Sequence, residues 1–146
     1  MTKMKISLYD SYQGKRREFV PLDENEVDIY YCGPTVYTYV HLGHFRPTTT
    51  FDLLTRFMDE CGYQVKCVSN YTDIDDKIIK EAQKEGKSEK DLSEFYIKAY
   101  EDCLDQLHIL PLYNHPKASQ YINIRASFIK DLVDKGYAYQ ADDDIY

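Results

Sequence analysis

The pattern of hydrophobic and polar positions predicts strands early in the chain and a helix after them. β-Branched and aromatic residues gather in two runs, Lys5 to Tyr9 and Val27 to Cys32, and the glycine and proline residues beside them are typical strand boundaries. The second run predicts a fully buried strand. From Pro47 onward, apolar residues recur at helical spacing as far as Gly62. This spacing predicts a helix of about four turns whose first turn contains Pro47.

A further strand pattern covers Val65 to Ser69. With the preceding strand and helix it makes a strand-helix-strand unit from Val27 to Ser69, and such units close as right-handed parallel crossovers. A parallel pair of this kind is half of a nucleotide-binding sheet. No repeat or low-complexity linker interrupts the chain, so the sequence predicts one unit of the α/β class.

Two more helices are predicted beyond this unit. Ser88 and Asp91 have the spacing of a capping box with Asp in place of Glu or Gln, and an apolar stripe follows. The stripe consists of Leu92, Phe95, Tyr96, Ala99, Cys103 and Leu107. A second helical pattern runs from Lys117 to Lys135 and ends at Gly136. Residues 137–146 predict the beginning of a β-hairpin, so the chain is expected to be a fragment of something longer.

Composition and charge narrow the class of protein. The chain has 146 residues, of which 43% are hydrophobic, enough for one packed core in about one domain. We expect it in the cytoplasm, because neither a membrane helix nor a signal-peptide core is apparent. The formal charge of -7 argues against a surface that wraps nucleic acid by itself. The cysteines form no CxxC pair and are expected to be reduced. Three of them fall on apolar positions and are therefore expected to be core thiols: Cys61, Cys67 and Cys103.

Candidate chemistry lies between the second strand and the following helix. The loop after the strand leads to His41, Leu42, Gly43 and His44, just before the expected helix. In open parallel sheets, ligands bind outside the carboxyl ends of the strands, where a helix start offers free N–H groups to phosphate. Either imidazole could donate a hydrogen bond to a phosphate, while Gly43 lets a ligand approach the backbone closely. Two partly exposed histidines without such a role would give the same short pattern.

Three motifs carry a resemblance to a known family. The segment Tyr31 to Tyr37 reads YCGPTVY, His41 to His44 reads HLGH, and Asn70 to Ile79 reads NYTDIDDKII. In this order they resemble the class I aminoacyl-tRNA synthetases, whose first signature is His-x-Gly-His, and among them the cysteinyl-tRNA synthetases. The resemblance extends from Ile6 to Asp10 (ISLYD) as far as Gly136 to Tyr139 (GYAY).

The resemblance implies a fold and a domain organisation. Residues 1–146 would be the amino-terminal part of a Rossmann-like, parallel-sheet catalytic domain, with an additional helical segment and a terminal β-hairpin start. The second half of the sheet, the Lys-Met-Ser-Lys-Ser loop that closes over ATP, and the anticodon-binding region have no counterpart in this sequence. We therefore expect this chain alone to be inactive.

The resemblance also implies roles for individual residues. His41 and His44 would be catalytic, and they would bind ATP, with its magnesium, together with Leu42 and Gly43. The residues implied to bind cysteine are Cys32, Gly33, Thr35 and Thr72. Cys32 would also be a zinc ligand, and the other ligands, a Cys, a His and a Glu, would lie beyond this chain. L-cysteine and tRNA(Cys) would be the other substrates, although this segment would contribute little to tRNA identity.

The remaining candidate ligands are expected to have structural roles. Three acids, Asp73, Asp75 and Asp76, favour a helix start over a metal cluster. His108 and His115 lie in unrelated helical segments and are not convincing partners for Cys32. Because zinc needs three or four protein ligands, we expect an incomplete or empty site in this chain.

Two other functions are compatible with the same motifs. The ligase that joins cysteine to an amino sugar in mycothiol synthesis resembles the synthetases but lacks the domain that reads tRNA. A shortened relative that binds a nucleotide or a partner protein without catalysis is the alternative from a different class. The leading hypothesis is an ATP-dependent, AMP-forming cysteine-tRNA ligase.

Overall fold

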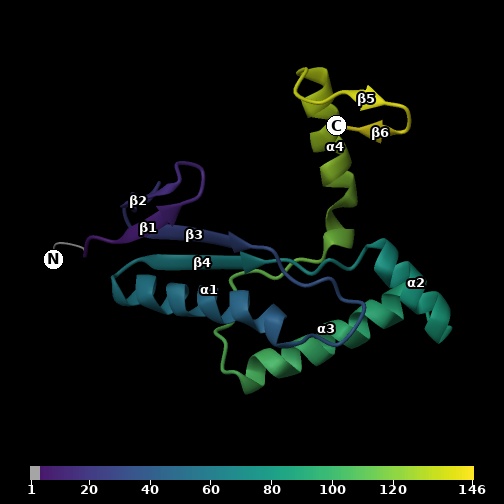
Figure 1. The fold of residues 1–146 in the computed structure, drawn as a ribbon, viewed down its shortest axis with the longest axis horizontal. Helices are drawn as coiled ribbons and strands as arrows, with labels where there is room; N and C mark the ends of the chain where they lie inside the picture. Colours follow the sequence, from purple (N-terminus) through teal and green to yellow (C-terminus); the bar gives the residue numbers. More distant parts are fainter. Residues whose placement is uncertain (1–3) are drawn as a thin grey trace.

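The computed structural model describes residues 4–146, which begin with a small hairpin (Figure 1). Strand β1 (Ser7–Asp10) pairs antiparallel with β2 (Lys15–Glu18). The turn between them contains Gly14 at a φ of 65°, a left-handed conformation that glycine adopts without steric cost. The first predicted strand is therefore present, two residues later than its pattern began.

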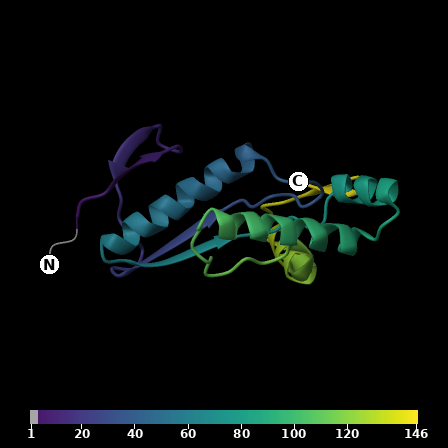
Figure 2. The same cartoon turned by 90° about the horizontal axis from the view of Figure 1, so that it is seen from below.

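The centre of the fold is the predicted strand-helix-strand unit. Strand β3 (Glu26–Tyr31) leads through a loop to helix α1 (Leu42–Glu60), and β4 (Gln64–Ser69) returns parallel to β3. Helix α1 lies along the pair in Figures 1 and 2. The prediction of a fully buried β3 is wrong. Only Val27 and Tyr31 are buried, because the helices cover one face of the strand and side chains alternate between its two faces.

Helix α1 begins earlier than its sequence pattern predicted. Its first residue is Leu42 and its N-cap is His41, so Pro47 lies inside the helix rather than in its first turn. Proline lacks the N–H that would bond to the carbonyl four residues earlier. The three threonines that follow it direct their hydroxyls to carbonyls of the preceding turn, for example Thr48 Oγ1 to the His44 carbonyl at 3.2 Å, but none of them replaces the missing bond to the Gly43 carbonyl. The helix ends at Glu60, and Gly62, the predicted stop, directly follows the C-cap Cys61 with a φ of 85°.

Buried residues form two clusters within residues 4–146. The first lies between the hairpin, β3 and α1 and contains Ile6, Val27, Met58 and Tyr63. The second lies between the loop after β3 and the next two helices and contains Val36, Tyr71, Ile78, Ala82, Leu92, Ile97 and Tyr100. The loop that carries the candidate motif is thus fixed by a core of its own, not only by the two strands.

Helices α2 (Asp76–Glu85) and α3 (Glu89–Gln106) pack against each other on this second cluster. Ser88 caps α3 through its bond from the Asp91 N–H, as the sequence predicted. The predicted apolar stripe is wrong in part, because Phe95 and Leu107 are exposed and the unpredicted residues Ile97 and Tyr100 are buried. Contacts with α1 select this face: Tyr100 stacks on Phe45 and bonds to Thr48.

The last third of the chain adds a third strand position and a projecting arm. Isolated parallel bridges join Val68 to Asn114 and Tyr71 to Lys117, so residues 113–118 follow the free edge of β4. The predicted single helix is divided into a 3-10 turn η1 (Ala118–Tyr121) and helix α4 (Ile122–Asp134).

Helix α4 and the terminal hairpin project from the body of the molecule in Figure 1. No residue of α4 is buried. The predicted hairpin is confirmed: β5 (Gln140–Ala141) pairs antiparallel with β6 (Asp144–Ile145). None of the helices within residues 4–146 combines the length and the hydropathy that crossing a bilayer requires.

Candidate active site

Two loops meet at the carboxyl ends of β3 and β4. The Thr72 N–H donates to the Pro34 carbonyl at 3.0 Å, and the Val36 N–H donates to the Thr72 carbonyl at 3.2 Å. These bonds continue the parallel pairing beyond the strands and place Thr35 directly opposite Thr72. The predicted neighbours Thr35 and Thr72 are therefore brought together by backbone pairing.

Gly33 lies where the two loops are closest. A β-carbon at this position would lie 1.7 Å from the backbone oxygen of Asn70, far inside any van der Waals contact. The close approach, rather than an unusual dihedral angle, is the reason that glycine is needed here. The Gly33 N–H donates to the Asn70 side-chain oxygen at 3.3 Å.

Asn70, which the sequence analysis did not assign to the site, connects three other residues. Its Oδ1 accepts hydrogen bonds from the Tyr30 hydroxyl at 2.9 Å and from the Gly33 N–H, and its Nδ2 donates to Thr72 Oγ1 at 3.1 Å. Desolvation, followed by the influence of the adjacent Cys32 thiol, raises the pKa of Tyr30, so the hydroxyl remains protonated and donates. The sequence does carry one signal for Asn70: it directly follows β4, and ligands of open parallel sheets bind at the carboxyl ends of the strands.

The two histidines cap helix α1 reciprocally. His41 Nδ1 accepts from the Gly43 N–H and His44 Nδ1 accepts from the His41 N–H, both at 3.1 Å, and the ring centroids are 4.1 Å apart. In a neutral imidazole whose Nδ1 accepts, the proton resides on Nε2. Neither Nε2 has a hydrogen-bond partner within the described part of the chain. Both rings therefore hold an available N–H donor at the positive end of the α1 dipole.

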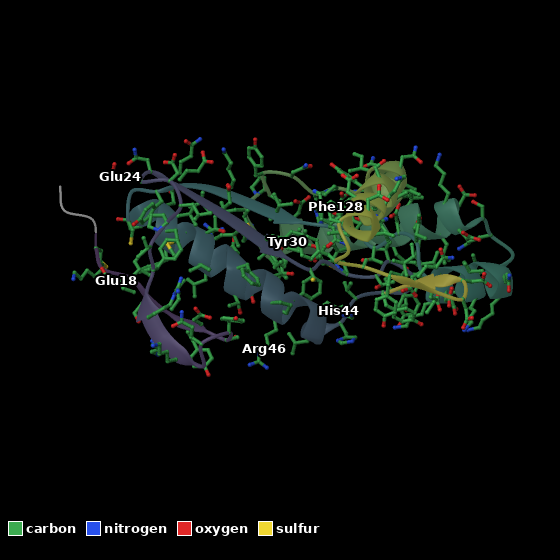
Figure 3. All side chains as sticks on the ribbon, turned by 90° about the horizontal axis from the view of Figure 1, so that it is seen from above. Glu18, Glu24, Tyr30, His44, Arg46 and Phe128 are labelled. Atoms are coloured by element: carbon green, nitrogen blue, oxygen red, sulfur yellow. The ribbon has the colours of Figure 1, made fainter. Side chains whose placement is uncertain are left out.

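The surroundings of these histidines are open. His41 is exposed and His44 half-buried, and Figure 3 shows His44 and Arg46 at the beginning of α1, with Tyr30 on the neighbouring strand. A β-carbon on Gly43 would come within 2.8 Å of the His41 ring, so glycine allows that ring to fold over the helix start. A ligand at this helix start would meet the two Nε2 donors at the positive end of the helix dipole, while the N–H groups of Gly43 and His44 are already bound within the cap.

Cys32 supplies a single potential metal ligand. Its thiol is free and exposed, and residues 4–146 contain no group of three His, Cys, Asp or Glu side chains arranged to hold a metal. His115 stacks on Tyr71 with ring centroids 3.6 Å apart, and burial lowers its pKa to about 4. A tetrahedral zinc site takes three or four protein ligands, so the side chains described here do not by themselves fit that metal.

The other predicted structural residues have specific partners. Asp75 caps α2 and Asp76 is its first residue, as predicted. Asp73 differs from the prediction, because its carboxylate accepts from the Ser119 N–H at 2.8 Å and from the Ser119 hydroxyl at 2.5 Å. It therefore ties η1 to the loop after β4. Among the predicted core thiols, Cys67 is buried, whereas Cys61 and Cys103 are half-buried.

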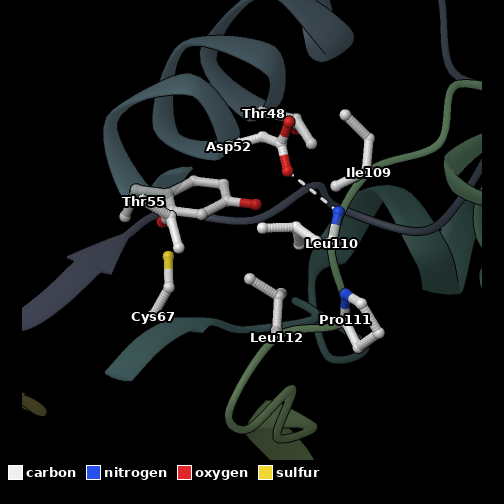
Figure 4. A pocket seen from close by; sticks show the side chains of 9 residues that line it. Thr48, Asp52, Thr55, Cys67, Ile109, Leu110, Pro111 and Leu112 are labelled. Atoms are coloured by element: carbon white, nitrogen blue, oxygen red, sulfur yellow. Dashed lines mark hydrogen bonds between the residues drawn. The ribbon is translucent and has the colours of Figure 1, made fainter. Parts of the chain in front are cut away.

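A small cavity lies behind the site, between α1 and residues 109–112 (Figure 4). Its volume of about 10 Å³ leaves room for about one water molecule and excludes a substrate. Asp52 closes one side by accepting from the Leu110 N–H at 2.8 Å. Burial, with a smaller contribution from Tyr100, raises the pKa of Tyr31 to about 12. This region supports α1 rather than binding a ligand.

The fold and the family match of residues 18–146 define a class I aminoacyl-tRNA synthetase catalytic domain. The chain is similar in structure to the agnB2 LeuRS of Agrobacterium radiobacter K84, solved as a ternary complex with tRNA and LeuAMS. The TM-score is 0.67 at 21% sequence identity, covering 82% of this chain and 16% of that one. This likeness establishes the shared fold.

Sequence similarity is more specific. Residues 18–146 match the family described as tRNA synthetases class I (C) catalytic domain, and the chain belongs to this family. It is 45% identical to the cysteine-tRNA ligase of Streptococcus pyogenes serotype M1 and 43% identical to that of Lachnoclostridium phytofermentans, in each case over 97% of the chain. The chain spans 32% and 30% of the length of these relatives. The resemblance seen in the sequence motifs is thereby confirmed.

Proposed function

We propose that the complete protein is a cytoplasmic cysteine-tRNA ligase and that residues 1–146 form the amino-terminal part of its catalytic domain. The carboxylate of L-cysteine would attack the α-phosphate of magnesium-bound ATP and release pyrophosphate. The terminal ribose hydroxyl of tRNA(Cys) would then attack the cysteinyl-adenylate and release AMP. Membership of the family and the 45% identity to a cysteine-tRNA ligase support this activity.

His41 and His44 would stabilise the phosphates of ATP in the first step. The reciprocal cap carries this assignment, because it occupies both Nδ1 atoms and leaves both Nε2–H groups as donors at the helix start. Leu42 would contribute its backbone N–H, whereas the Gly43 N–H is already bound by the His41 ring, and Gly43 would let ATP approach the helix start closely. Such donors act by electrostatic stabilisation of charge that grows in the transition state, not by removing a proton.

The paired loops would bind the amino acid. Gly33, Thr35 and Thr72 lie together at the carboxyl ends of the parallel strands, which is where ligands of open α/β sheets bind. The exposed Cys32 thiol would contribute one thiolate to a zinc ion whose other ligands lie outside residues 1–146. Thiolate ligands suit zinc, and a metal that prefers sulfur would distinguish cysteine from serine better than shape alone.

The proposal is tested by ATP-pyrophosphate exchange with the full-length protein that carries this chain. We expect exchange that depends on cysteine and is weaker with serine by several orders of magnitude. A control variant on the exposed helix α4, Asn123→Asp, should exchange at the wild-type rate. Exchange that depends on another amino acid, or none with cysteine, would refute the proposed substrate.

A further inference from the structure

The orientation of the Asn70 carboxamide is fixed by its neighbours. A backbone N–H can only donate, so the atom facing Gly33 must be the side-chain oxygen. The Tyr30 hydroxyl donates to the same oxygen at 2.9 Å. The amide nitrogen is then the atom that faces Thr72 Oγ1, at 3.1 Å, and it can only donate.

This orientation decides what the Thr72 hydroxyl can do. Its oxygen accepts from Asn70, while the backbone N–H and carbonyl of Thr72 are used in the pairing with Pro34 and Val36. The hydroxyl proton has no acceptor within the described part of the chain. Thr72 is only half-buried and lies opposite Thr35, so this proton remains available to a ligand in the site.

We propose that Asn70 is a positioning residue that holds the Thr72 hydroxyl as a hydrogen-bond donor to an acceptor atom of the bound amino acid. The inference rests on the proposed function, in which the bound amino acid is cysteine. Its carboxylate and its thiolate can both accept a hydrogen bond. Asn70 also fixes the Gly33 N–H, and so both loops of the site depend on one side chain. It does not touch the substrate in this arrangement and acts through Thr72.

Asn70→Asp reverses the polarity of this contact without changing the size of the side chain. One carboxylate oxygen still accepts from Tyr30 and Gly33, but the other now accepts the Thr72 proton and turns it away from the ligand. In exchange assays of the full-length protein we expect the KM for cysteine to rise about 10- to 100-fold, the range for loss of one buried hydrogen bond. The KM for ATP should stay within about twofold, and Asn123→Asp, the same change on an exposed face, should leave both values unchanged.

A double-mutant cycle separates positioning from a general effect on folding. Thr72→Val removes the hydroxyl at nearly constant volume and should raise the KM for cysteine to a similar extent. Adding Asn70→Asp to Thr72→Val should then raise it little further, because the group through which Asn70 acts is already absent. Multiplied effects of the two changes would contradict the proposal. If Asn70→Asp does not fold, Thr72→Val decides alone, and an unchanged KM for cysteine would overturn it.

The outcomes distinguish this inference from the proposed function. A wild-type protein that shows no cysteine-dependent exchange overturns the function and the inference together. A wild-type protein that exchanges with cysteine, but whose Asn70→Asp variant keeps the wild-type KM, overturns the inference alone.

Discussion

Replacing Gly33 by alanine tests the closeness of the two loops. The new methyl group would lie 1.7 Å from the Asn70 oxygen and 2.9 Å from Ser69 Oγ, whereas ordinary contacts begin at 3.4 Å. The loops must separate by about 1.7 Å to restore an ordinary contact, and an overpacked position of this kind costs about 1–3 kcal/mol. The separation also stretches the 3.3 Å bond from the Gly33 N–H to Asn70.

The effect on activity should exceed the effect on stability. Misplacement by about 1 Å can cost a hundredfold in rate, so we expect Gly33→Ala in the full-length protein to lower kcat/KM for cysteine by about 100-fold. Urea unfolding measures the stability, and ATP-pyrophosphate exchange measures the activity. Gly136→Ala is the control: its φ of 74° also strains alanine, but its β-carbon would meet open space. It should lose about 1 kcal/mol of stability and no activity. Wild-type kcat/KM in Gly33→Ala would refute the reasoning.

Three further changes test the site and its support. His41→Asn should lower kcat for exchange about 100-fold, because one transition-state donor is lost. Thr48→Val should lower the free energy of unfolding by about 1–2 kcal/mol, since it leaves the buried Tyr100 hydroxyl without its 3.0 Å partner. Tyr100→Phe should cost less, because the Thr48 hydroxyl keeps its bond to the His44 carbonyl. His115 has a pKa lowered from 6.5 to about 4 by burial, so the unfolded state binds its proton first and stability falls as the pH drops from 6.5 towards 4. The expected loss is up to about 3 kcal/mol, and His115→Phe should remove this part of the pH dependence in urea titrations.

Each of these expectations has a contradicting result. Unchanged exchange in His41→Asn would remove that ring from the mechanism. For the hydroxyl pair, the double variant should cost less than the sum of the single variants, and strict additivity would show that the two groups are not coupled. For His115, equal pH dependence of wild-type and variant stability between pH 7 and pH 4 would show that the ring is not buried as a neutral group.

Local sequence signals predicted the helices, the strands and the loop that carries the motifs. They did not predict the long-range contacts that decide where a helix begins and which of its faces is buried. Proline is common in a first helical turn, and so Pro47 misplaced the start of α1, which the reciprocal His41–His44 cap sets instead. The buried face of α3 could not be predicted because Tyr100 is held by Thr48, which lies 52 positions away in the chain. Such pairings depend on the assembled fold, which periodicity along one helix does not encode.

In the candidate site, too, some residues could be predicted from local sequence signals and others depend on contacts in the assembled fold. His41, His44, Gly33 and Thr72 could be selected from motifs, because spacing and residue type carry their chemistry. Asn70 belongs to one of these motifs and directly follows β4, but its role could not be predicted, because it depends on contacts that reach Tyr30 across 40 positions of the chain.

Formation of cysteinyl-tRNA tests the central claim most directly. The full-length protein that carries this chain would be incubated with ATP, magnesium, labelled cysteine and tRNA(Cys), and label bound to tRNA would be measured. The account predicts cysteinyl-tRNA and release of AMP, with no product when tRNA(Cys) is replaced by a non-cognate tRNA. Activation of cysteine without transfer to tRNA, or transfer to an amino sugar instead, would contradict it.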